Sequence, residues 1–119
     1  MESEMNIVVL QGKLSRAPEV RSTANGDVIS YEVTSQPDEG RAMTAPVAWL
    51  SPPKAAYALE AGDSVTVVGQ VRRRFFRSGG STQSRTEVVA DLVVSSRRKA
   101  QISSELERVL GELDAVVAG

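Results

Sequence analysis

The chain has no cysteine and no histidine among its 119 residues. Without cysteine it can form neither a disulfide bond nor a thiolate metal site, and it has no thiol nucleophile. Without histidine it lacks the commonest general base and the commonest metal ligand. The carboxylates are scattered and show no pairing typical of an acid and a base in catalysis. We therefore expect a protein that is not an enzyme and that binds no metal or cofactor.

Long apolar runs are absent as well. Met1–Glu4 is acidic where a secretory signal would be basic, and no apolar run follows that could form the core of a signal or span a membrane. These features predict a cytoplasmic protein. The length suits one domain with one modest core.

The charges are distributed unevenly along the chain, although the net charge is only −1. Residues 1–71 have a net charge of −4, residues 72–99 of +6, and residues 100–119 of −3. A polyanion responds to the local potential rather than to the total charge. The basic block therefore favours a nucleic-acid partner.

Alternating apolar residues and turn residues predict an all-β protein. The expected strands are residues 5–14, 28–35, 41–50, 63–76 and 86–95. A short helix is expected over 54–60 and an amphipathic helix over 102–117. Five strands with a short helix between the third and fourth is the order of the oligonucleotide/oligosaccharide-binding barrel, or OB-fold. We thus predict a five-stranded OB-fold barrel over residues 5–96, followed by a basic linker and an added C-terminal helix over 97–119.

The fourth expected strand has the most informative pattern. Arg72, Arg74 and Phe76 share one face, at steps of about 7 Å. Two guanidinium groups can bind phosphates while an aromatic ring stacks on a base, and this combination needs no particular base sequence. Phe75 lies on the same side of the strand as the apolar residues and is expected in the core. Arg73 shares that side but lies near the open end of the strand, so the sequence does not decide whether it is buried or exposed.

Four further residues are candidates for nucleic-acid binding. Arg77 and Arg85 flank a Gly/Ser-rich segment, which we expect to be a flexible loop that folds over the strand. Trp49 either stacks on a base or packs in the core, and the sequence does not separate the two. Lys13, near Arg16 at the end of the first strand, either contacts phosphate or keeps a sheet edge soluble.

Three segments resemble bacterial single-stranded DNA-binding proteins. They are MNIVVLQGKL with PEVR and the following Asn25-Gly26, LEAGDSVTVVGQVR at 59–72, and TEVVA at 86–90. The resemblance covers roughly residues 5–95. It implies an OB-fold that binds single strands without sequence preference in replication, recombination or repair, usually as a tetramer, in association with the nucleoid. We expect a homo-oligomer, either a tetramer or a dimer, with single-stranded DNA as its partner. The family's stacking aromatic in this strand falls on Phe76.

The chain also departs from that family. Trp49 lies near one of the family's other aromatic positions, Thr44 falls where a tryptophan is common, and no aromatic lies between Gln36 and Gly40. Instead of a long tail with an acidic tip the chain has the amphipathic helix, so it looks like a short paralogue of the kind found in actinobacteria. Fewer stacking positions imply weaker binding or altered partners.

Three questions stay open from the sequence alone. The C-terminal helix either packs on its own barrel or joins subunits, since Leu106 and Leu113 are one heptad apart. The main alternative to DNA binding is a homo-oligomeric interaction module with weak or no nucleic-acid affinity. RNA binding is not separable from DNA binding, because stacking and phosphate contacts do not sense the 2′-hydroxyl.

Overall fold

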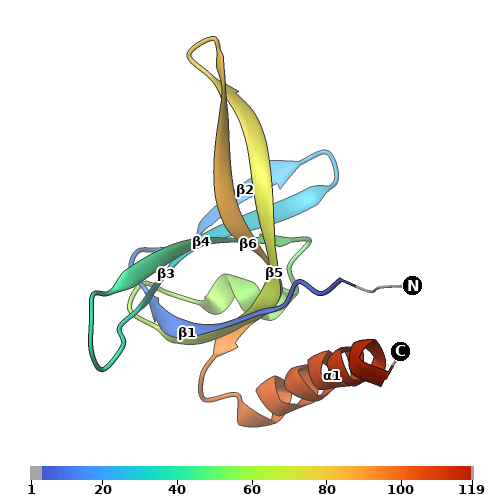
Figure 1. The fold of residues 1–119 in the computed structure, drawn as a ribbon. Helices are drawn as coiled ribbons and strands as arrows, with labels where there is room; N and C mark the ends of the chain where they lie inside the picture. Colours follow the sequence, from blue (N-terminus) through green and yellow to red (C-terminus); the bar gives the residue numbers. More distant parts are fainter. Residues whose placement is uncertain (1–3, 119) are drawn as a thin grey trace.

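Strands dominate the structure, a computed structural model that describes residues 4–118. In chain order the strands are β1 (Val8–Leu14), β2 (Glu19–Thr23), β3 (Gly26–Ser35), β4 (Met43–Leu50), β5 (Ser64–Ser78) and β6 (Ser81–Ser95). A 3₁₀-helix, η1 (Lys54–Ala58), lies between β4 and β5, and an α-helix, α1 (Lys99–Ala118), follows β6 (Figure 1). The mostly β character that the sequence predicts is confirmed. The acidic start of the chain falls mainly on residues 1–3, outside the described residues.

Five of the strands form a ring in the order β1-β5-β6-β4-β3, which closes where β1 pairs with β3. The closing contact is short and consists of Lys13 opposite Thr34 and Leu14 opposite Val33. Strands β4 and β6 pair in parallel, and the other pairs are antiparallel. Strand β2 lies outside the ring, paired with β3 as a hairpin.

The expected strand count and helix position need correction. Residues 19–23 form β2, so there are six strands, and the short helix lies between the fourth and the fifth of them. This helix is a 3₁₀ turn that ends at Ala58, two residues before the predicted end. The extra strand forms because Gly26, with φ of +111°, allows the chain to reverse tightly enough for Thr23 to pair with it.

Strands β5 and β6 continue beyond the ring as a two-stranded hairpin, which rises above the rest of the molecule in Figure 1. We call this part, residues 72–78 and 81–87, the arm. The prediction of a flexible loop over 77–85 is wrong, because these residues pair in register up to Ser78 opposite Ser81. Gly79 and Gly80 have φ of +59° and +83°, as a two-residue hairpin turn requires.

The ring encloses a core of aliphatic residues with two buried aromatic residues, Tyr31 and Trp49. Gly69 marks the point where β5 leaves the ring, opposite a bulge in β6 at Asp91. A Cβ at Gly69 would lie 2.1 Å from the Val89 carbonyl oxygen, so only glycine fits this close approach. Beyond Gly69, β5 stays paired with β6 but no longer with β1, and no other strand covers the side of β5 that faces the core in the ring. Phe75 is therefore 68% exposed, and its predicted place in the core is wrong.

Helix α1 packs outside the ring against β5, on the side away from the arm (Figure 1). Ile102 and Val109 are buried, and Val109 belongs to the main apolar cluster. Arg108 Nη2 lies 3.4 Å from Asp91 Oδ2 and ties the helix to the bulge. Packing on its own barrel, one of the two predicted roles of this helix, is thus observed. None of the described helices is both long and apolar enough to cross a bilayer.

Candidate nucleic-acid interface

A groove on the outer face of the ring collects arginines from four parts of the chain. Two adjoining hollows of about 180 and 110 Å³ form it, between the β2–β3 hairpin and the arm. We call it the arginine groove. Its charged lining residues are Arg16, Arg21, Arg72, Arg74 and Arg85, with Glu19, Glu32 and Glu87. Five cations against three anions leave a net charge of +2 in a concave surface, which suits an anionic ligand.

The arm supplies one wall of this groove through alternate residues of β5. Arg72 and Arg74 both contact Glu87, and the guanidinium of Arg74 lies over the ring of Phe76. The three β5 residues therefore lie on one face, as their alternation predicts. Arg85 is the cross-strand neighbour of Arg74 and also lines the groove. Three arginines of the basic block, Arg72, Arg74 and Arg85, thus lie together on this wall.

Glu87 is the buried anion of the groove, with an exposed fraction of 6%. Its Oε1 lies 3.1 Å from Arg72 Nη2 and 3.0 Å from Arg74 Nε. A carboxylate so shielded from water needs compensation, which two guanidinium groups provide. The side chains of Arg72 and Arg74 are themselves 41% and 36% exposed. Glu87 therefore holds both arginines in place while each keeps donors accessible to a ligand.

The opposite wall comes from the β1–β2 connection and β2. Arg16 donates a hydrogen bond to Glu19 at 3.0 Å, and its Nε lies 3.8 Å from Glu32 Oε1. Arg21 lies across the hairpin from Val28. Within residues 4–118, Arg21 and Arg85 take part in no ion pair, so these two cations are the least compensated in the groove.

The floor of the groove consists of small and aliphatic residues on the outer faces of β3 and β4. They are Val28, Ser30, Pro46, Ala48 and Leu50. Thr44, at a position where the resemblance implies an aromatic residue, is exposed and hydrogen-bonds to Thr34 at 2.8 Å. Thr44 does not line the groove, whose floor offers apolar contact and the hydroxyl of Ser30. Tyr31 also borders it but is only 2% exposed, so its ring is not accessible for stacking.

The chain has five aromatic residues, and all of them lie in the part of the chain that the structure describes. Phe76 is the one among them that lies on the groove face of the arm. The Arg74 guanidinium carbon lies 5.3 Å from the centre of its ring, at cation–π distance. The side chain is 37% exposed. Phe76 thus extends the arginine groove along the arm with an aromatic surface that a ligand can reach.

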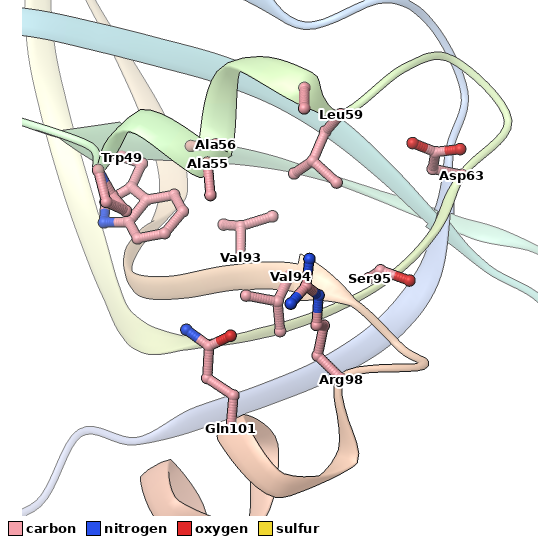
Figure 2. Close-up of a pocket in the computed structure, with 12 residues that line it drawn as sticks. Trp49, Ala55, Ala56, Leu59, Asp63, Val93, Val94, Ser95, Arg98 and Gln101 are labelled. Carbon is pink, nitrogen blue, oxygen red and sulfur yellow. The ribbon is translucent and has the colours of Figure 1, made fainter.

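Trp49 lies in the core with an exposed fraction of 6%. Its indole borders a separate pocket of about 280 Å³ between η1 and the start of α1, with Leu59 and Val93 nearby and Arg98 and Gln101 at its edge (Figure 2). Trp49 therefore takes the second of its two predicted roles, that of a core residue. In the alternation along β4 its side chain lies on the side that faces the inside of the ring. Trp49 does not line the arginine groove.

The structure places the remaining predicted residues away from the groove. Lys13 lies where β1 pairs with both β3 and β5 and borders a different hollow with Gln36. Arg77 lies at the tip of the arm and donates a hydrogen bond to the Gly80 carbonyl oxygen at 3.1 Å. Arg73 donates to the hydroxyl of Ser84 at 2.9 Å and lies, with Phe75, on the arm face opposite the groove.

The sequence analysis did not identify Arg21 or the role of Glu87, and for Arg16, as for Lys13, it left open phosphate contact or a soluble sheet edge. Arg21 enters the groove because residues 19–23 pair with β3, a strand that the sequence analysis did not predict. Its signal in the sequence is the alternation Glu19, Val20, Arg21, which puts both charged residues on one side of a strand. Glu87 could have been found from its place opposite Arg72 once the hairpin turn was fixed.

The side chains of the groove suit an anion such as phosphate. Its donors are guanidinium groups, which stay protonated and recognise phosphate through several N–H groups. Among residues 4–118, no three acidic side chains are placed to hold a metal ion. A scan against models of known protein families gave no match, and a search among curated proteins found no relative.

Proposed function

We propose that this protein is an OB-fold that binds single-stranded DNA without sequence preference, in replication, recombination or repair. The observation that supports this most is the arginine groove, where Arg21, Arg74 and Arg85 converge from three separate strands. Phe76 continues the same surface along the arm. The proposal is one of binding rather than catalysis, at the nucleoid in the cytoplasm.

The strand order supports the assignment to the OB-fold. When β2 is left out, the strands β1, β3, β4, β5 and β6 correspond to strands one to five of a five-stranded barrel. Their order around the ring is then one, four, five, three, two. OB-folds bind oligonucleotides on the face of their second and third strands, between the loop that joins strands one and two and the loop that joins strands four and five. Here these parts are β3 with β4, the β2 segment, and the arm. The arginine groove lies between them.

The two walls and the floor would divide the recognition of a single strand. The arginines of both walls contact successive phosphates, and each contact adds about −0.7 to the slope of log affinity against log salt. Phe76 stacks with one base through the ring face that Arg74 leaves uncovered. The floor accepts sugars and base edges without hydrogen-bond selection. Within residues 4–118 neither η1 nor α1 lines this groove, and α1 packs on the side away from the arm, so neither helix is positioned to enter a duplex groove (Figure 1).

A salt-titrated binding assay with labelled oligo-dT tests the proposal. Arg74→Ser should weaken binding about tenfold and make the salt slope shallower by about 0.7. Arg41→Ser is the matched control, because Arg41 is exposed in the β3–β4 connection and does not line the groove. It should leave both quantities unchanged.

Three outcomes of this assay would overturn the proposal. Absence of binding to dT at low salt by the folded protein would select the interaction module instead. Equal losses in Arg74→Ser and Arg41→Ser would show that only the overall charge matters. Tighter binding to rU than to dT would reassign the ligand to RNA.

A further inference from the structure

The arm has a second face that the arginine groove does not use. Phe75 is 68% exposed there, and Val71, which directly precedes the arm on the same side of β5, is 46% exposed. Arg73 and Arg77 alternate with them. The cross-strand neighbours of Arg73, Phe75 and Arg77 are short and polar: Thr86, Ser84 and Thr82. An exposed phenylalanine and valine between two arginines form a surface that is both apolar and basic.

Helix α1 has a complementary surface. Leu110, Leu113 and Val117 are 54%, 39% and 77% exposed, and their steps of three and four residues put them in one stripe. Glu107 and Asp114 are seven residues apart, about two helical turns, and therefore lie on the same side of the helix. At 100° per residue, that side borders the apolar stripe on the flank away from the barrel. The stripe is therefore apolar and bordered by acidic residues.

Charge decides which surface fits this helix. In an antiparallel pair of two such helices, Glu107 and Asp114 of one would face the same acidic residues of the other, which is unfavourable. The other flank of the stripe is covered by this chain's own barrel, because Val109 packs on the ring there. A partner can therefore reach the stripe only from its acidic flank. A basic apolar surface such as that of Arg73 and Phe75 has the complementary charge.

The arm and α1 lie at opposite ends of the molecule (Figure 1), so the two surfaces of one chain cannot meet. We propose that the face of the arm with Arg73, Phe75 and Arg77, together with the adjoining Val71, docks on the Leu110–Leu113–Val117 stripe of a second copy. Two copies related by a two-fold axis form this contact twice, which doubles the area that one small patch could bury.

The arginine groove lies on the other face of the arm and stays open in such a dimer. The contact does not depend on DNA, so the proposal stands or falls separately from the proposed function. It replaces helix–helix pairing, the predicted mode of subunit assembly, with contact between arm and helix.

Sedimentation velocity over a range of protein concentrations tests the proposal. The parent should dimerise, and Phe75→Glu and Leu113→Glu should each raise the dimer dissociation constant at least about tenfold. Neither residue is buried in the ring, so both variants should keep the parent's circular dichroism spectrum and melting temperature. Met43→Glu is the control, since Met43 is 70% exposed and belongs to neither surface.

A charge exchange tests the pairing itself. Arg73→Glu with Arg77→Glu should weaken the dimer, as should Glu107→Lys with Asp114→Lys, and the chain with all four changes should recover it. A monomeric parent, a dimer indifferent to Phe75→Glu and Leu113→Glu, or no recovery in the fourfold variant would each overturn the proposal. A loss of dT affinity in Phe75→Glu with unchanged dimerisation would also overturn it, because the second face of the arm would then bind nucleic acid.

Discussion

Arg74 lies with its guanidinium carbon 5.3 Å from the centre of the Phe76 ring. The same side chain contacts the buried carboxylate of Glu87 through Nε, at 3.0 Å. This contact is an ion pair without a hydrogen bond from Nε. Arg74 therefore lies between an anion toward the barrel and an aromatic ring toward the tip of the arm. A bound strand would meet a phosphate-binding group and a stacking surface whose relative positions are set before binding, which lowers the entropy lost on association.

Phe76→Ala should weaken binding to a dT oligonucleotide of about eight nucleotides by roughly 5- to 150-fold, the equivalent of about 1–3 kcal/mol for one stacked base. Phe75→Ala is the matched control, since it removes the same side chain from the opposite face of the arm. Its affinity should equal that of the parent when the protein is dilute. Fluorescence anisotropy measures both variants, and equal effects would contradict stacking on Phe76.

Glu87→Gln should tighten binding to dT several-fold at low salt. The change removes one of the three anions of the groove and releases Arg72 and Arg74 for phosphate. Each additional phosphate that these arginines bind should steepen the salt slope by about 0.7. Removing one partner of a buried ion pair destabilises a protein, so the variant should also melt at a lower temperature. Weaker binding by a folded variant would contradict this, because the positioning of the arginines by Glu87 would then outweigh its negative charge.

Much of the ring could be predicted from the sequence, because one-sided burial leaves a period of two. The alternation of Ile29, Tyr31 and Val33 places all three in the core. The same rule failed for Phe75. Parity tells which side of a strand a residue occupies, but not whether another strand covers that side. Beyond Gly69, β5 has no such cover.

The candidate site was harder to predict, because it depends on strand pairs far apart in sequence. Arg72 and Arg74 could be placed on one face from local alternation. Arg21 joins them only because β2 pairs with β3 and the ring then brings that hairpin near the arm. Trp49 illustrates the reverse case, since its burial depends on η1 and α1 covering that end of the barrel (Figure 2).

Gly69→Ala should destabilise the protein by about 1–3 kcal/mol. The new Cβ would lie 2.1 Å from the Val89 carbonyl oxygen and 2.9 Å from the Ala90 Cα, and both are backbone atoms of the bulged strand that cannot move alone. Gly111→Ala is a control with the opposite expected sign. It lies in α1 with nothing within 4 Å of the added Cβ, so it should stabilise by about 1 kcal/mol, or roughly 4 °C in Tm. Thermal and urea denaturation measure both, and a Gly69→Ala protein as stable as the parent would contradict the close approach.

Trp49 is the only tryptophan and lies in the core, so its emission reports on the barrel rather than on the groove. Saturation with oligo-dT should change the intensity and the emission maximum little. Unfolding in urea should shift the emission to the red, as the indole becomes exposed to water. Strong quenching by dT in the folded protein would place Trp49 at the binding site and contradict its packing against the pocket at η1.

Tyr31 should make the stability of the protein depend on alkaline pH. Burial raises the pKa of its hydroxyl, and the neighbouring Tyr57 adds to the rise. In the unfolded chain the hydroxyl ionises near pH 10. Above that pH the unfolded state has lost a proton that the folded state still holds, so the free energy of unfolding must fall as pH rises.

Urea denaturation of the parent and of Tyr31→Phe measures this difference. The two curves should run parallel from pH 7 to 9, and above about pH 10 the parent should lose stability faster. Parallel curves at all pH values would mean that the Tyr31 hydroxyl ionises as readily in the barrel as in the unfolded chain.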